Sequence, residues 1–108
     1  MATINEQVVA LVTCPVELAE GFAHQLVDNR LAACVNIVPR VVSVYRWEGT
    51  VEQDDEALMI IKTSRSRLAV IEQHLVEVHP NEVFELITVP VTGGAQNYLD
   101  WITAQTRN

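Results

Sequence analysis

Two adjoining segments of this chain keep strand-forming residues over a length that few strands reach. The first runs from Arg30 to Gly49 and the second from Thr50 to Thr63. Each retains β-branched and aromatic character for roughly 14 residues, whereas an ordinary strand holds about 5–6. Glu48-Gly49 suits a tight turn between the two segments, because glycine accepts the positive φ that such hairpins require. One small domain cannot cover a hairpin of this length.

Hydrophobic periodicity predicts a strand and a helix before the hairpin. Residues Val8 to Thr13 form a short run that is apolar on both faces, which is typical of a central strand. Pro15 suits the first turn of a helix. The apolar residues that follow repeat at the i, i+4 spacing of one helix face: Leu18, Ala19, Phe22, Ala23, Leu26 and Val27.

After the hairpin, the pattern predicts a second helix, a strand and a short last helix. Ser64 or Ser66 is expected to cap the second helix, whose apolar positions 68, 71, 75 and 78 share one face, and Pro80 ends it. The fourth strand is expected at 84–91 and the last helix at 97–104. This βαββαβ order with an added helix predicts a ferredoxin-like α+β sandwich, an antiparallel sheet with both helices on one face.

The composition is that of an ordinary globular domain and argues against two classes of partner. The 108 residues, 49% hydrophobic and 19% charged, fit a single domain over 1–108. The net charge of −7 argues against nucleic acid and anionic membranes, because both require a cationic face. The segment from Met1 to Gln7 has no basic stretch followed by an apolar one, so we expect a cytoplasmic protein whose Cys14 and Cys34 are reduced.

Two predicted strands are apolar on both faces. Residues Val8 to Val12 and Ala57 to Ile61 are apolar in succession, although two helices on one side of a sheet cover only one of its faces. A symmetric homo-oligomer would cover the second face and would protect the edges of the long hairpin. The alternative is a monomer in which loops and the last helix cover that face.

Five separate segments, in order along the chain, resemble the CutA divalent-cation-tolerance family. They are Arg30 to Ile37 (RLAACVNI), Tyr45 to Gly49 (YRWEG), Ile60 to Thr63 (IIKT), His79 to Leu86 (HPNEVFEL) and Tyr98 to Trp101 (YLDW). The resemblance extends from Val8 to Ile102. It implies a ferredoxin-like fold, a compact homotrimer whose long strands pair between subunits, and an association with tolerance of copper or other divalent cations.

The chain departs from the family pattern in two places. Its connection from Cys14 through Pro15 to the first helix is one residue shorter than the family spacing, in which the cysteine lies slightly earlier, near Val12. The other departure is in the loop before the fourth strand. The family usually reads H-P-Y-E-V-P-E, whereas this chain has Asn81 in place of the aromatic residue and Phe84 in place of the second proline. A looser loop before the fourth strand is therefore expected.

Topology predicts that residues of metal-ligating type gather at one edge of the sheet. Strands one and three are taken as parallel neighbours, with strand four antiparallel beside strand one. The edge then holds Thr13, Cys14, Lys62, His79 and Glu82. Thiol and imidazole are good ligands for copper or zinc, and the N-terminus of the first helix would favour a Cys14 thiolate. His79, Cys14 and Glu82 are the candidate ligands for Cu²⁺ or Zn²⁺, neither of them obligatory. The alternative is a buried Cys14 and a His79 that makes loop hydrogen bonds.

Lys62 raises a second hypothesis, a cleft for a small ligand. A buried lysine on a strand needs a carboxylate or an anionic ligand, and Glu56 and Glu85 are its candidate partners. Tyr45 or Trp47 from a neighbouring subunit could wall the same cleft. A purely structural ion pair is the competing interpretation.

No motif of a known enzyme class is present, so no catalytic activity is expected. The sequence has no glycine-rich nucleotide loop, Gly-x-Ser-x-Gly or His-Glu-x-x-His. Acylphosphatases and RNA-recognition modules share the predicted topology, but residues 13–15 lack the arginine of the first and the acidic charge opposes the second. Three classes stay open: a metal-binding tolerance protein, a small-ligand-sensing trimer, and a scaffold defined by its stable assembly.

Overall fold

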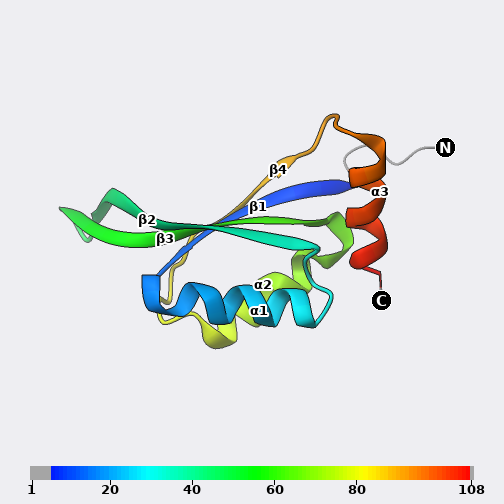
Figure 1. Ribbon diagram of the computed structural model, residues 1–108. Helices are drawn as coiled ribbons and strands as arrows, with labels where there is room; N and C mark the ends of the chain where they lie inside the picture. Colours follow the sequence, from blue (N-terminus) through cyan, green and yellow to red (C-terminus); the bar gives the residue numbers. More distant parts are fainter. Residues whose placement is uncertain (1–5, 108) are drawn as a thin grey trace.

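The computed structural model describes residues 6–107 as a sheet with two helices against one face (Figure 1). The sheet has the strand order β2-β3-β1-β4, and every neighbouring pair is antiparallel. The strands are β1 (Gln7–Cys14), β2 (Cys34–Trp47), β3 (Thr50–Ser64) and β4 (Leu86–Pro90). The helices are α1 (Ala19–Asp28), α2 (Leu68–Val78) and α3 (Gln96–Gln105), with 3₁₀ turns η1 (Val16–Leu18) and η2 (Arg65–Arg67) before the first two. The predicted α+β class and antiparallel sheet are confirmed.

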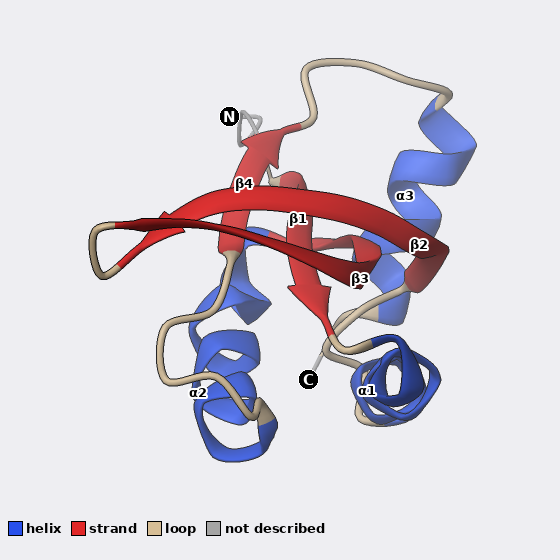
Figure 2. Cartoon of the chain, turned by 90° about the vertical axis from the view of Figure 1, so that its left-hand side faces the viewer, coloured by secondary structure: helices blue, strands red, loops and turns tan. Residues whose placement is uncertain are grey.

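The core lies between one sheet face and the two helices α1 and α2, which Figure 2 shows side by side below the sheet. Alternate residues of β1 and β3 are buried there, from Val8 to Cys14 and from Ala57 to Thr63. The helices bury the stripes that their periodicity predicted: Phe22, Ala23 and Leu26 from α1, and Ile71 and Leu75 from α2. The alternate residues of the strands and the apolar stripes of the helices therefore pack together in one layer.

β1 and β3 run antiparallel, so the expectation of parallel neighbours is wrong. The chain passes through α1 into β2, which makes β2 parallel to β1, and the hairpin then reverses its direction in β3. Cys14 consequently pairs with Ala57, while Lys62 pairs with Val9 near the opposite end of β1. Lys62 does not lie on the edge that holds Cys14.

The hairpin turn forms where the sequence places it. Glu48 and Gly49 have φ values of 49° and 82°, and two positive φ values are what a type I′ turn requires. The β2–β3 pairing shifts register between Val38 and Val41, where Pro39 and Arg40 lie opposite a single residue of β3. This is a β-bulge, and it accommodates a proline because a bulge leaves one residue outside the ladder.

Residues 41–56, which we call the arm, project past the helix layer. Figure 1 shows this part of the hairpin extending away from α1 and α2. Every residue of the arm is exposed or half-exposed, on both faces of the ribbon. The sequence therefore predicted correctly that one domain does not cover the hairpin.

The sheet face opposite α1 and α2 is apolar. It carries Val9, Leu11, Leu58, Ile60, Ile87 and Val89, hereafter the open face. Ile87 and Val89 keep 54% and 48% of their surface exposed. Of the described elements, α3 covers this face at one end, where the Gln7 amide donates to Thr103 Oγ1 at 2.9 Å and the Ser64 and Thr106 hydroxyls lie 2.5 Å apart.

Two element ends differ from the sequence prediction. Ser64 precedes η2 but makes no capping bond with its side chain, because its hydroxyl contacts Thr106. Ser66 lies within η2 and caps no helix either. The fourth strand spans Leu86–Pro90 instead of 84–91, and the Phe84 ring just before it stacks against His79.

Candidate functional site

His79 is held at the end of β1 by hydrogen bonds at both ring nitrogens. The residue follows α2, and its side chain is 8% exposed. Nε2 lies 2.9 Å from the carbonyl oxygen of Thr13, and Nδ1 accepts the N–H of Asn81 at 3.1 Å. Because a carbonyl oxygen only accepts, the Nε2 proton points to Thr13 and the imidazole is neutral. No lone pair of the ring is left for a metal ion in this arrangement.

The loop after His79 is packed onto its ring. Phe84 stacks on the imidazole with 4.9 Å between centroids and 17° between planes, and Phe22 of α1 lies at 6.1 Å. Asn81 contributes the backbone N–H described above. Both residues that depart from the family pattern therefore make contacts inside this loop.

Cys14 is a buried thiol beside this corner. Its side chain is 0% exposed, and its strand partner is Ala57. Burial, followed by the negative charges of the nearby Glu56 and Glu17 carboxylates, raises the pKa of the thiol from 9.0 to about 11. The expected stabilisation of a thiolate by the first helix is wrong, because desolvation and negative neighbours dominate.

The three predicted metal ligands lie at the same end of the sheet but are not assembled. His79 contacts Thr13, the neighbour of Cys14, while Glu82 is exposed in the loop before β4. Among residues 6–107, no group of three or more His, Cys, Asp or Glu side chains is arranged to hold a metal ion. Binding at His79 would require the ring to release Thr13 or Asn81, and the metal site stays a prediction.

The five cleft candidates lie in separate parts of the subunit. Glu85 is exposed in the loop before β4, and Tyr45 and Trp47 lie near the tip of the arm, 40% and 47% exposed. Glu56 is on the same strand as Lys62 but six residues away, roughly 20 Å along the strand. Within the described residues, no ion pair joins Lys62 to Glu56 or Glu85. The expected partners of Lys62 are therefore not its partners within one subunit.

Tyr45 is tied down within the arm. Its hydroxyl donates to the carboxylate of Asp54 on the opposite strand. This hydrogen bond is the main reason that the pKa of Tyr45 is raised to about 12, with the negative charges of Asp54 and Glu52 adding to it. A role for Tyr45 as the wall of a cleft in another subunit stays a prediction.

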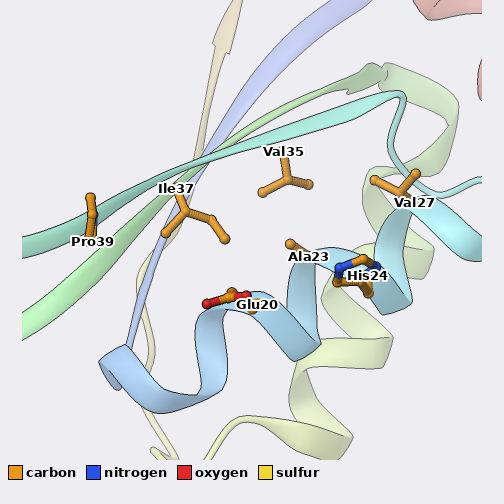
Figure 3. Close-up of a pocket in the computed structure, with 7 residues that line it drawn as sticks. All are labelled: Glu20, Ala23, His24, Val27, Val35, Ile37 and Pro39. Atoms are coloured by element: carbon orange, nitrogen blue, oxygen red, sulfur yellow. The ribbon is translucent and has the colours of Figure 1, made fainter.

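Two shallow grooves lie beneath the edge strands, and the sequence reasoning identified neither. The first, of about 510 Å³, lies between α1 and β2 (Figure 3) and is lined by Glu20, Ala23, His24, Val27, Val35, Ile37 and Pro39. The second, of about 630 Å³, lies between α2 and the β4 segment and includes Glu82. Val27, which is 41% exposed on α1, is the sequence signal for the first groove, because it extends the apolar stripe beyond the core.

The antiparallel sheet, the helix pair on one face and the apolar open face define a small α+β sandwich protein. The chain belongs to the CutA1 divalent ion tolerance protein family, whose model matches residues 8–105. The family predicted from the sequence is thus confirmed.

Relatives and solved structures agree with this assignment. The chain is similar to "Protein CutA, chloroplastic" of Arabidopsis thaliana, with 46% identity over 102 residues that cover 94% of this chain and 56% of the relative. It is similar to "Divalent-cation tolerance protein CutA" of Thermus thermophilus, with 40% identity over 101 residues, 94% of this chain and 98% of the relative. The crystal structure of CutA1 from Oryza sativa superimposes with a TM-score of 0.92 at 42% identity, covering 98% of both chains. This chain spans a little over half the length of several curated relatives, including those of Arabidopsis and mouse.

The names of similar proteins refer to more than one compartment. No helix within residues 6–107 has the length and apolarity needed to cross a membrane. The interpretation of Met1 to Gln7 rests largely on residues 1–5, which lie outside the described residues. The Arabidopsis relative is named as a chloroplastic protein, and a similar solved structure from Archaeoglobus fulgidus is named as a periplasmic one. A cytoplasmic location of this chain stays a prediction.

Proposed function

We propose that this chain acts in divalent-cation tolerance as a non-enzymatic homotrimer of ferredoxin-like subunits. The open face carries the proposal: Val9, Leu11 and Ile60 form one apolar surface with Ile87 and Val89 on the sheet. Soluble monomers rarely leave a large contiguous apolar surface exposed. The arm supports the same conclusion, because its unpaired edges are templates for pairing with another chain.

Sedimentation equilibrium tests the assembly directly. The subunit has a mass of 12.1 kDa, and we expect a species of about three subunit masses at micromolar concentration. A mass of 12.1 kDa that persists at these concentrations would contradict the proposal.

We further propose that direct binding of Cu²⁺ or Zn²⁺ is weak and centres on His79. The charge of −7 attracts dications over long range. Binding has to displace a hydrogen bond at His79 and, if Cys14 takes part, a proton from a thiol of raised pKa. Because protons and the metal compete for the same lone pairs, binding weakens on acidification.

Calorimetric titration of the reduced protein with each metal tests this site. His79→Ala should bind more weakly than wild type, and Cys14→Ser should show whether the thiol takes part. His24→Ala is the matched control, because His24 is exposed on α1. Since His79 is buried, His79→Gln is a second variant whose amide can still donate to Thr13. Wild-type binding in both His79 variants would refute the assignment.

The alternative function is a trimer that binds a small ligand, or that serves only as a scaffold. One observation favours a ligand: Lys62 is half-buried and has no charged partner among the described residues. A thermal shift upon addition of metabolites would support this alternative, because a ligand that binds only the folded state stabilises it. If neither metals nor metabolites bind, the scaffold is the function that remains.

A further inference from the structure

The groove between α1 and β2 combines an apolar wall with one carboxylate (Figure 3). Val35 and Ile37 of β2 line it and face the helix layer, because they pair with Ile61 and Met59, both completely buried in the core. The groove has a volume of about 510 Å³, and sites for small molecules usually span about 300–1,000 Å³. It is therefore large enough for a small organic molecule.

The space exists because α1 presents a small residue to the strand. Ala23 lines the groove and is 8% exposed, so its methyl group leaves a gap that a larger side chain would fill. Val27, one turn further along α1, adds apolar surface that is 41% exposed. Pro39 lines the groove at the end of the same strip of β2. A ligand that covers these apolar groups removes them from water, which is favourable.

Glu20 gives the groove its charge. Among the described residues that line the groove, it is the one carboxylate, and none is a lysine or an arginine. No ion pair joins Glu20 to a cation within residues 6–107. The next cation along β2, Arg40, is already paired with Asp55 of the arm at 3.0 Å. His24 lines the groove one turn after Glu20, and the charge balance does not depend on it.

Further negative charge lies near the same end of α1. Glu17 precedes Glu20 by one turn, in η1. After burial, the charges of Glu56 and Glu17 are the causes of the raised pKa of the Cys14 thiol, so both act at the end of β1 that leads into α1. Like charges repel and unlike charges attract over this range. A cation is therefore favoured at the Glu20 end of the groove, and an anion is disfavoured.

We propose that this groove binds a small organic amine, whose ammonium group pairs with Glu20 and whose hydrocarbon part lies along Val35 and Ile37. One ammonium balances one carboxylate, and its N–H groups donate charge-assisted hydrogen bonds to it. Apolar walls with a few placed polar groups are the usual make-up of a small-molecule site. This inference goes beyond the proposed function, because it involves neither His79 nor Lys62.

The groove lies on the helix side of the sheet, away from the open face. A homotrimer that buries the open face therefore does not fill it. The residues of β2 that line it, at positions 35, 37 and 39, also precede the arm, which begins at residue 41. The groove is complete within one subunit, so a free amine in solution is the occupant that we infer.

Thermal unfolding of the reduced full chain with hexylamine hydrochloride tests the groove. Ethylamine hydrochloride, sodium hexanoate and sodium chloride at equal ionic strength are the comparisons. Hexylamine should raise the melting temperature most, because ligand binding to the folded state stabilises it and the longer chain covers more of β2. In calorimetry, each added CH₂ should tighten binding by at most about fourfold. Hexanoate, which has the same length but the opposite charge, should give no increase.

Variants of α1 locate the binding site. Glu20→Gln should abolish the hexylamine shift, and because Glu20 is exposed this variant keeps the fold. Asp28→Asn is the matched control, since Asp28 is an exposed carboxylate of the same helix outside the groove, and it should keep the shift. Ala23→Leu should remove the shift by filling the gap, measured against its own melting temperature without amine. A wild-type shift in Glu20→Gln, or equal shifts with hexylamine and hexanoate, would overturn the inference.

A second copy of the chain is the other occupant to be tested. Sedimentation of Glu20→Gln without amine should give the wild-type subunit number. A lower number would mean that a cationic side chain of another subunit fills the groove, and the inference would then be wrong. The wild-type subunit mass and the metal titration of His79 do not depend on amine binding, so failure here is distinguishable from failure of the homotrimer or of the metal site.

Discussion

The arm and the rest of the β2–β3 hairpin, which we call the base, belong to one ladder interrupted by a single bulge, but they have opposite surroundings. In the base, Ala57, Met59 and Ile61 are completely buried against the helices. In the arm, Val44 and Val51 expose 63% and 60% of their surface. Both parts are built from good strand formers, so strand propensity explains the ladder in each. Burial, which only the base obtains from its own chain, sets the difference in stability.

The interactions that hold the arm are of a different kind. Nη2 of Arg40 lies 3.0 Å from Oδ2 of Asp55, with both side chains more than half exposed, and Tyr45 donates to Asp54. Exposed pairs of this type contribute at most about 1 kcal/mol each, and an isolated two-stranded hairpin is marginally stable in water. The arm is therefore the part of the fold that gains most from a partner.

The largest effect should come from the base. Ile61→Ala should lower the free energy of unfolding by about 2–5 kcal/mol, because it leaves a cavity in the core. Val51→Ala is the matched arm variant and should cost less than about 1 kcal/mol. Urea unfolding measures both. Equal losses would mean that the arm is buried as deeply as the base, and the comparison would fail.

The second largest effect should come from introducing a charge on the apolar side of the arm. Val42→Glu or Val44→Glu should lower the subunit number in sedimentation and cost about 1–3 kcal/mol in thermal unfolding, because a partner would have to bury an unpaired charge. Val70→Glu on α2, at a site 46% exposed, is the control and should change neither quantity. Unchanged assembly and melting in both arm variants would show that the arm needs no partner.

Cys14 offers a pH test of burial in the base. Its thiol has a pKa of about 11 in the folded chain against 9.0 as the ordinary value. Folding thus favours the protonated form, so its contribution is complete below pH 9.0 and is lost as the pH rises towards 11. The unfolding free energy should fall more steeply over this range than in Cys14→Ala.

Two controls sharpen the Cys14 test. The Tyr45→Phe background removes the other side chain with a large raised pKa. Alkylation below pH 9 should be slow at Cys14, because about 100-fold less thiolate is present than for an unperturbed thiol. Parallel pH curves, or rapid alkylation of the folded protein at Cys14, would argue against a buried thiol.

The smallest effect should come from the ion pair of the arm. Arg40→Ala should cost at most about 0.5 kcal/mol, and the difference should vanish in high salt. Arg46→Ala serves as the comparison, since no ion pair of Arg46 is present among the described residues. A loss above about 1 kcal/mol for Arg40→Ala would reveal a charge network in the arm.

Sequence periodicity predicted the helices and strands better than it predicted how the strands run and pair with one another. Alternation in β1 and β3 and the glycine of the turn are local signals, and the structure confirms both. The direction of β3 depends on counting reversals along the whole chain, and one wrong step placed Lys62 beside Cys14. The Cys14 pKa depends on solvent access, which residue types do not report.

In the candidate site, too, the sequence predicted the position of a residue but not its contacts. Reasoning from sheet edges brought His79 to the end of β1, where the structure places it. The sequence does not show that Thr13 and Asn81 occupy both ring nitrogens, because that depends on the fold of one short loop. The grooves under the edge strands were missed for a similar reason, since they arise from the spacing between a helix and a strand.

The bulge at Pro39 and Arg40 has a consequence for how this fold can vary among relatives. Before it, odd-numbered residues of β2 such as Ile37 pair with odd-numbered residues of β3, and after it even-numbered ones such as Val42 do so. One additional residue thus shifts the phase of a strand halfway along its length. Deleting that residue would exchange the two faces of the arm on β2 while the base kept its register. A single codon can therefore change the surface that the arm presents while leaving the hydrophobic core of the domain intact.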